Sequence, residues 1–180
     1  MQALFLTIGA IAVVVLVFFI VSLFLPPKVR VARSLFMKAP AEKIFHEINS
    51  LRNWRHWSPW HKQDQDPGMK NVYGATEEGP GATYRWESHR RKTGRGKLII
   101  TASKPFRFIA ADIYFMGRGL MKGYYRLDPA DGGTRVTWSF EAYTGNHPLR
   151  KLMGLMMDKW MGRDFEKGLN NLKQITEFKA

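Results

Sequence analysis

The hydrophobic pattern begins with an uninterrupted apolar segment, residues 3–25, which contains no charged side chain. As a helix this segment would be about 34 Å long, enough to cross a hydrocarbon core of about 30 Å with a slight tilt. We therefore predict a transmembrane anchor in residues 1–27 and a single domain in residues 28–180. The alternative is a cleaved secretory signal, but no basic residue precedes the run, which is also longer than a usual signal.

Positive side chains follow the apolar segment closely. Lys28, Arg30 and Arg33 come directly after it, and Lys38 and Lys43 lie within the next ten residues. No basic residue precedes the segment. Because basic residues are retained on the cytoplasmic side of a membrane helix, this asymmetry predicts a cytoplasmic domain.

The next part of the chain carries the periods of both strands and helices. Residues 29–37 are typical of a strand, and residues 39–51 have apolar positions at helical spacing after a proline suited to the first helical turn. Residues 53–81 are rich in turn formers and predict a short helix and a strand near Val72. Strand-like runs separated by Gly, Pro and Asp then predict an antiparallel meander over residues 82–88, 96–103, 107–115, 120–127 and 134–143.

From Pro148 the apolar period becomes that of a helix, with one broad apolar face that must be buried against another element. A run of antiparallel strands followed by one long helix predicts an α+β fold in which a curved sheet wraps around that helix. Alternate strand residues would face the space between sheet and helix, and these are large and apolar. They are Tyr84, Trp86, Val136, Trp138 and Phe140.

Short motifs occur in a fixed order along these predicted elements. They include Trp54-x-x-Trp57-Ser58-Pro59-Trp60, Tyr84-x-Trp86, Gly94-x-Gly96, Gly132-Gly133-Thr134-x-Val136-Thr137-Trp138 and Asp164-Phe165-Glu166-Lys167-Gly168-Leu169. Over about residues 29–178 the set resembles the START-like helix-grip superfamily (SRPBCC), in its polyketide cyclase/dehydrase and lipid-transport branch. The resemblance implies a hydrophobic cavity between the sheet and the last helix. The apolar first segment also resembles the anchor of bacterial members, which implies the bacterial inner membrane.

A cavity of this kind gives a set of candidate ligand-binding residues. They are Tyr84, Trp86, Ile100, Phe108, Trp138, Phe140, Met153, Met156 and Trp160. The methionines of the last helix suit contents of variable shape, because thioether side chains are flexible and polarizable. The same spacing is also that of a plain core, so the space is either filled or open. Likewise Trp54, Trp57 and Trp60 either plug one end of the sheet or stand at the cavity mouth.

The net charge of +13 and the pI of about 10.2 predict attraction to a polyanion. Basic residues are densest on a predicted hairpin, at Arg90, Arg91, Lys92 and Arg95. No recognised nucleic-acid motif is present, and anionic lipid headgroups reward each nearby Lys or Arg by about 1 kcal/mol. We therefore expect this hairpin to contact an anionic membrane surface, and expect no specific nucleic-acid partner.

The sequence shows little catalytic chemistry. The absence of cysteine excludes thiol catalysis and Cys-ligated zinc, and the histidines form no HExxH pair. Asp64-x-Asp66 begins like a calcium loop but lacks the later ligands, so we predict no metal, cofactor or assigned catalytic residue. An acid or base beside the pocket would have to come from Asp112, Tyr114, Glu141, Asp158 or Asp164.

Three functions remain open from the sequence. The favoured one is a non-enzymatic, membrane-anchored protein that binds a lipid or another apolar small molecule between the sheet and the last helix. The second is a cyclase-like enzyme acting on a polyketide, and the third is an interaction module with a closed core that docks an acidic partner.

Overall fold

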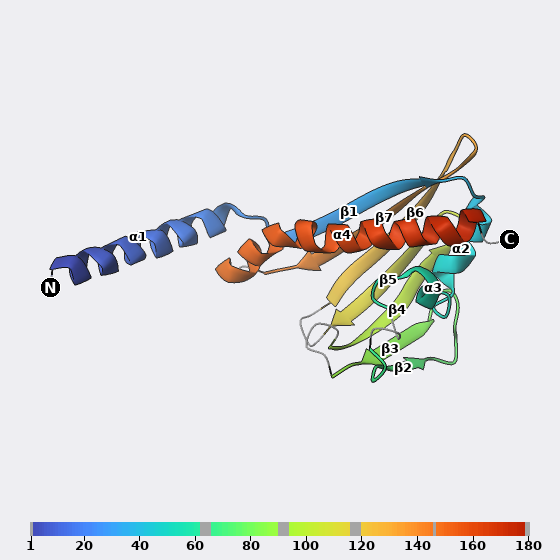
Figure 1. Ribbon diagram of the computed structural model, residues 1–180, viewed down its shortest axis with the longest axis horizontal. Helices are drawn as coiled ribbons and strands as arrows, with labels where there is room; N and C mark the ends of the chain where they lie inside the picture. The colour runs from blue at the N-terminus through green and yellow to red at the C-terminus, as the bar shows by residue number, and fades with distance from the viewer. Residues whose placement is uncertain (1, 62–65, 90–93, 116–119, 146, 179–180) are drawn as a thin grey trace.

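The computed structural model describes residues 2–61, 66–89, 94–115, 120–145 and 147–178 (Figure 1). The described chain contains four helices and seven strands, and most of them coincide with the predicted segments. In chain order they are α1 (Gln2–Phe24), β1 (Lys28–Met37), α2 (Ala41–Asn49), α3 (Trp54–Trp57), β2 (Lys70–Tyr73), β3 (Thr83–Glu87), β4 (Arg95–Lys104), β5 (Phe108–Phe115), β6 (Leu120–Ala130), β7 (Gly133–Tyr143) and α4 (Pro148–Phe178).

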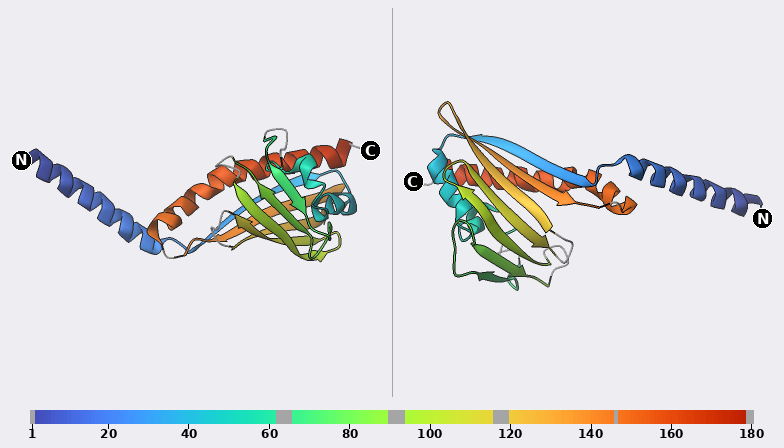
Figure 2. Two further views of the ribbon diagram at one scale, coloured as in Figure 1. Left: turned by 90° about the horizontal axis from the view of Figure 1, so that it is seen from below. Right: turned by 180° about the vertical axis from the view of Figure 1, so that it is seen from behind.

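The seven strands form one antiparallel sheet in the order β1-β7-β6-β5-β4-β3-β2. The sheet curves around α4, so the predicted α+β helix-grip fold is confirmed (Figure 2). Lys28 pairs with Tyr143, and Leu120 with Tyr114, so the β1 start, the β7 end and the hairpin ends of β5 and β6 share one end of the sheet. We call this the α1 end, and the opposite end, which carries α2 and α3, the far end.

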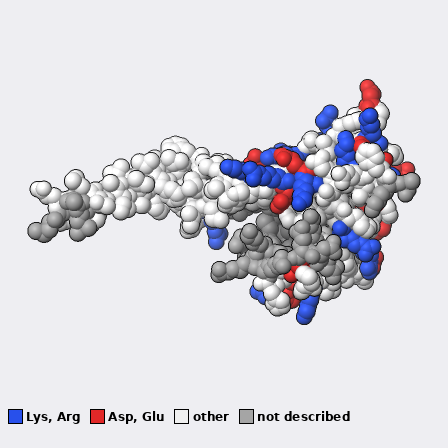
Figure 3. Space-filling model, viewed as in Figure 1, with Lys and Arg blue, Asp and Glu red and all other residues white. Residues whose placement is uncertain are grey.

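Helix α1 projects from the α1 end of the sheet, beside the start of α4 (Figures 1 and 2). Within the described residues it is the one helix long and apolar enough to cross a membrane, over Phe5–Phe24 with a mean hydropathy of 3.0. In Figure 3 this arm carries no charged atoms, whereas Lys and Arg side chains begin where the arm meets the domain. A hydrogen bond from Lys151 Nζ to the Ser22 carbonyl, at 3.2 Å, joins the last turn of α1 to α4.

The strand register decides which side chains face α4. Val31, Phe140 and Gly123 are cross-strand partners on the inner, concave face, and so are Arg33, Trp138 and Tyr125 in the next row. These positions alternate with polar outer ones such as Ser34 and Thr137. The predicted inner-face alternation in β3 and β7 is confirmed, because side chains alternate between the two faces of a sheet.

Aromatic rings fill the inner space at the far end. Trp138 stacks on Phe165 of α4 with ring centroids 4.2 Å apart and planes 7° apart. Trp57 meets the Trp138 edge at 5.6 Å, and Trp54 lies 5.2 Å from Trp57. The core interpretation of the tryptophan motif is thus confirmed for Trp54 and Trp57, whose side chains are buried and whose indole N–H groups donate to backbone carbonyls of α2.

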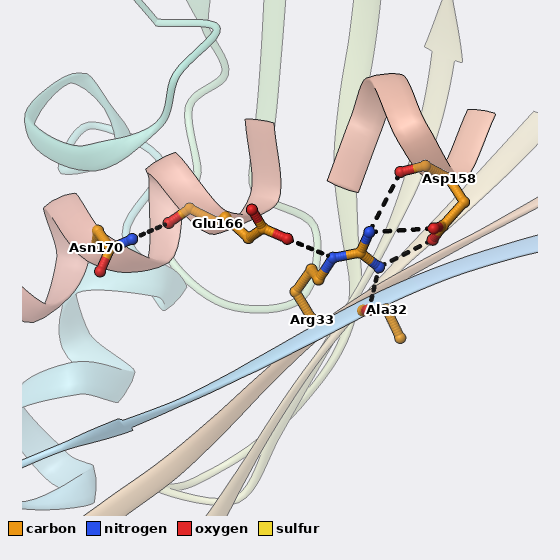
Figure 4. Close-up of polar contacts among 5 residues, drawn as sticks. All are labelled: Ala32, Arg33, Asp158, Glu166 and Asn170. Atoms are coloured by element: carbon orange, nitrogen blue, oxygen red, sulfur yellow. Dashed lines mark hydrogen bonds and ion pairs between the residues drawn. The ribbon is translucent and has the colours of Figure 1, made fainter. Parts of the chain in front are cut away.

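Helix α4 is fastened to the edge strand β1 by Arg33, which points inward from the sheet (Figure 4). Its guanidinium donates to both carboxylate oxygens of Asp158, at 2.9 and 3.1 Å, and to Glu166 Oε1 at 2.8 Å. Hydrogen bonding to Asp158 raises the pKa of Arg33, and the same bonds lower the pKa of Asp158. Such forked, charge-assisted bonds fix geometry as well as charge, so this Arg33 cluster sets where α4 crosses the sheet.

Glycines let α4 approach the sheet closely. A methyl group on Gly162 would collide with the Arg33 guanidinium, and one on Gly168 would lie 2.6 Å from the Trp138 ring and 3.0 Å from Pro59. Glycine inside a helix costs about 1 kcal/mol relative to alanine. Its presence at these positions is therefore explained by packing.

We expect Gly168→Ala to lower the free energy of unfolding by about 1 to 3 kcal/mol, because the rigid Trp138 ring cannot yield to the added methyl. The measurement is denaturant unfolding of the full chain in mild detergent. Lys167→Ala is the matched control, since Lys167 is the exposed neighbour on the same helix and should change stability by less than about 0.5 kcal/mol. An increase in stability for Gly168→Ala would contradict this packing.

Candidate functional site

The inner face of the sheet is sealed at the far end and half-exposed at the α1 end. In β5, Ile109 and Ala111 are buried, but Ile113 is half-buried. The same change occurs in β6 between Tyr125 and Met121, and in other strands that cross the sheet. Because neighbouring strands change together, the α1 end is where the space between sheet and helix meets solvent.

The half-buried apolar residues at the α1 end come from both layers. They are Trp86, Ile113, Phe115, Met121 and Ala142 from the sheet, and Met157 and Met161 from α4. A continuous row of rings leads from the core to this surface. The ring centroids of His61 and Tyr84 are 4.1 Å apart. Tyr84 stacks on Trp86 with centroids 5.6 Å apart, and Trp86 stacks on Phe115 with centroids 6.2 Å apart. We call the half-buried residues of this end together the inner apolar surface. They are Trp86, Ile113, Phe115, Met121, Ala142, Met157 and Met161.

The residues that the sequence nominated for ligand binding fall into three groups. Tyr84, Ile100, Trp138 and Phe140 are buried on the inner face, and Trp86 is half-buried there. Met153, Met156 and Trp160 lie on the first half of α4 with 49%, 48% and 53% of their surface exposed. The first group forms the floor of the inner space, whereas the α4 group stands on its outer rim.

Phe108 belongs to neither group, and its nomination is corrected by the register. It pairs with Arg126 and stacks on Tyr124, 6.1 Å away, on the outer face of the sheet. The reason is the alternation within β5, which puts Ile109, Ala111 and Ile113 on the inner face and Phe108 on the opposite face.

The candidate acids and bases are also dispersed. Asp112, Tyr114 and Glu141 lie on the outer face, where Asp112 pairs with Lys122 at 3.2 Å and Glu141 with Arg30 at 3.9 Å. Asp158 is held by Arg33. The Asp164 carboxylate accepts a hydrogen bond from Trp60 Nε1 at 3.0 Å, and the Trp60 ring packs against Trp138 and Phe165.

The basic hairpin lies only partly within the described structure. Arg90, Arg91 and Lys92 are outside the described residues, and Arg95 is exposed at the α1 end of β4. Beside Arg95 the outer face has a shallow depression of about 450 Å³. Its lining includes Lys70, Arg85, Arg95 and Lys97 against the single acid Glu87, so basic side chains predominate there.

A small polar group interrupts the aromatic interior near β2. The Tyr84 hydroxyl donates to Asn71 Oδ1 at 2.8 Å, and the Tyr73 hydroxyl lies 3.4 Å from His61 Nε2. Burial lowers the pKa of His61 to about 4 and raises the pKa of Tyr84. His61 is therefore neutral at pH 7, and no local sequence pattern indicated that this histidine would be buried among rings.

Metal-binding geometry is not evident in the described parts of the chain, where no group of three or more His, Cys, Asp or Glu side chains comes together.

The residues that sequence reasoning missed are Arg33, His61, Ile113 and Met121. Ile113 and Met121 could have been found from strand alternation, since they continue the inner rows of β5 and β6. Arg33 and His61 could not, because their roles depend on partners more than 10 residues away.

The burial of His61 predicts a pH-dependent stability. The pKa of His61 is about 4 in the folded chain and about 6.5 in the unfolded chain. Between pH 4 and pH 6.5 the imidazole is therefore protonated in the unfolded state but neutral in the folded state. Stability should therefore fall as the pH drops from 6.5 to 4, by at most about 3 kcal/mol. The measurement is the free energy of unfolding against pH. His61→Phe should flatten this slope and the exposed-site control His46→Gln should not, whereas an unchanged slope in His61→Phe would contradict the assignment.

Known structures show the same architecture. A protein from Chromobacterium violaceum is 15% identical, with a TM-score of 0.57 over 84% of this chain and 99% of that chain. A protein of unknown function from Staphylococcus aureus is 12% identical, with a TM-score of 0.63 over 83% and 93%. The di-domain ARO/CYC StfQ from the steffimycin biosynthetic pathway is 11% identical, with a TM-score of 0.62 over 83% of this chain and half of that one. Identities this low show a shared fold alone.

A comparison with curated proteins gave no match. The sequence does match a family, described as polyketide cyclase/dehydrase and lipid transport, over residues 28–177. The match begins where α1 ends and includes the whole sheet and nearly all of α4. The chain therefore belongs to the polyketide cyclase/dehydrase and lipid transport family of helix-grip proteins.

Proposed function

We propose that this chain is a membrane-anchored binding protein for an apolar small molecule or lipid, held between the sheet and α4 at the α1 end. One observation carries the proposal: along the strands, inner residues change from buried to half-exposed toward α1. Large apolar side chains left half-exposed in a concave space are typical of binding sites rather than of plain core.

The side chains of the inner apolar surface suit such a ligand. Trp86 and Phe115 offer flat ring faces, and their rings are stacked. The Trp86 ring lies over Gly96, where any side chain would collide with it. Met121, Met157 and Met161 face the same space and adapt to ligand shape at little cost. Met153, Met156 and Trp160 then form the rim, and Tyr84, Ile100, Trp138 and Phe140 the floor.

We further propose that α1 is a retained anchor in residues 1–27, that residues 28–180 form a cytoplasmic domain, and that the membrane is a bacterial inner membrane. An apolar ligand partitions into the bilayer, so a site tethered beside the bilayer meets it at high local concentration. The exposed Arg95 and the hairpin residues Arg90, Arg91 and Lys92 would add attraction to anionic headgroups.

The ligand is tested by purifying the full chain from native membranes in mild detergent and identifying bound molecules by mass spectrometry. We expect a stoichiometric lipid or other apolar molecule. Ile113→Trp should reduce its occupancy severalfold, because the larger ring fills the half-open space. Tyr114→Trp is the control, since it places the same indole ring on the outer face of the same strand.

Trp138→Ala is a poorer probe, because this ring is stacked on Phe165 and its loss should destabilise the core by about 3 to 5 kcal/mol. Equal melting temperatures of Ile113→Trp and Tyr114→Trp would show that folding is intact in both variants. Retention of full occupancy by folded Ile113→Trp would refute the proposed site.

Catalysis is a second candidate, because the family description names cyclases and dehydrases and Asp164 is hydrogen-bonded to Trp60, whose ring packs on the inner residue Trp138. The same mass spectrometry distinguishes the two functions. A cyclised polyketide bound to the protein would favour catalysis, whereas an unmodified lipid would favour carriage. Recovery of an acidic protein partner without any small molecule would favour the interaction module.

The anchor predicts that the intact mass of the mature chain includes residues 1–27 and that the chain resists extraction from membranes by alkaline carbonate. A reporter fused after Ala180 should be active only in the cytoplasm. Release of a shortened chain beginning after Pro27 would instead establish a cleaved signal.

A further inference from the structure

The first half of α4 carries an apolar stripe that no described part of the domain covers. Leu149, Met153, Met156 and Trp160 are each about half exposed. Their spacing of four, three and four residues keeps them on one face of the helix. The opposite face is the packed one, where Lys151 and Gly154 are buried against α1 and β1. The stripe is thus free surface on a helix whose other side is fixed.

The depth of this stripe follows from one contact and from the length of α1. Lys151 donates to the carbonyl of Ser22, which lies about 3 Å along the axis from the end of α1. If α1 spans the bilayer, Lys151 stands at the level of its last turn. Leu149 and Met156 lie within about 8 Å of Lys151 along α4, and Trp160 within about 14 Å. Most of the stripe is therefore at the depth of the lipid headgroups.

The hydrogen bond between Lys151 and Ser22 holds the start of α4 against the end of α1. The last carbonyls of a helix lack intrahelical donors, and a lysine ammonium there is favoured by the helix dipole. Lys151 and Ser22 are both buried at this contact, with 8% and 2% of their surface exposed. The start of α4 is thus held against α1, rather than left to move on the short linker.

The chemistry around the stripe points to lipid. Tryptophan and methionine suit the boundary between acyl chains and headgroups, and the exposed basic residues beside the stripe suit anionic headgroups. These are Arg150, Lys159 and Arg163. A second copy of the chain is a poorer occupant, because the basic residues of two identical surfaces would repel each other across a shared apolar seam.

We propose that the first three turns of α4 lie in the interfacial layer of the bilayer, with the stripe of Leu149, Met153, Met156 and Trp160 against lipid. This inference rests on the proposed anchoring by α1. It adds a second membrane contact, which fixes the orientation of the domain. The rim of the inner apolar surface then faces the membrane, so a ligand passes between bilayer and site without crossing water.

The experiment uses the absence of cysteine, which makes every introduced thiol unique. Met156→Cys and Gln174→Cys are made in the full chain, spin-labelled and reconstituted into phosphatidylcholine and phosphatidylglycerol vesicles. Gln174 is exposed and lies on the same face of the same helix as Met156, about five turns further from α1. Collisions with oxygen, which enters lipid, and with a nickel chelate, which stays in water, then measure depth.

We expect the oxygen-to-nickel collision ratio at residue 156 to be severalfold higher than at residue 174, and Leu149→Cys to agree with Met156→Cys. If vesicles float with the protein but the label at residue 156 is aqueous, the interfacial contact is wrong and the anchor stands. Protection of residue 156 from both reagents would show a protein contact instead and would also overturn the inference. Failure of the protein to float with vesicles would overturn the anchor and this inference together.

Discussion

The attachment of α4 along the edge strand β1 is the constraint on which the rest of this structure depends. Helix α4 packs mainly on β1 and much less on β7, and Arg33 binds it there through Asp158 and Glu166. A helix held at the edge cannot cover the whole concave face of a seven-stranded sheet. The remaining inner face has to be covered by something else or stay open, because large apolar side chains occupy it on several strands.

The two ends of the sheet resolve this constraint differently. At the far end, Trp54 and Trp57 of α3 pack over Tyr125 and Trp138 and complete the core. At the α1 end the inner side chains remain half-exposed, between β5, β6 and the methionines of α4. The packed core and the proposed binding surface therefore lie at opposite ends of one layer, so side chains at the open end can change without loss of the core.

The position of α1 determines which end of the sheet would face a membrane. The apolar helix α1, the start of α4 and the half-exposed inner surface all lie at the same end of the sheet because β1 begins just after α1 ends. An apolar helix attached at the far end would have lain away from this surface. In this chain the covalent order of the elements places the apolar segment, the apolar surface and Lys151 together.

The sequence by itself determined the apolar helix, the order of the strands, the long last helix and the family, because periodicity and turn residues are local properties. Strand alternation also identified most of the inner face, including Tyr84, Trp86 and Trp138. Alternation within β5 places Phe108 outward, against its nomination, and only the tertiary structure decided that Met153, Met156 and Trp160 stand on a rim. It also decided that His61 is buried and that Arg33 holds α4. Burial and pairing depend on residues distant in the chain, which no local pattern encodes.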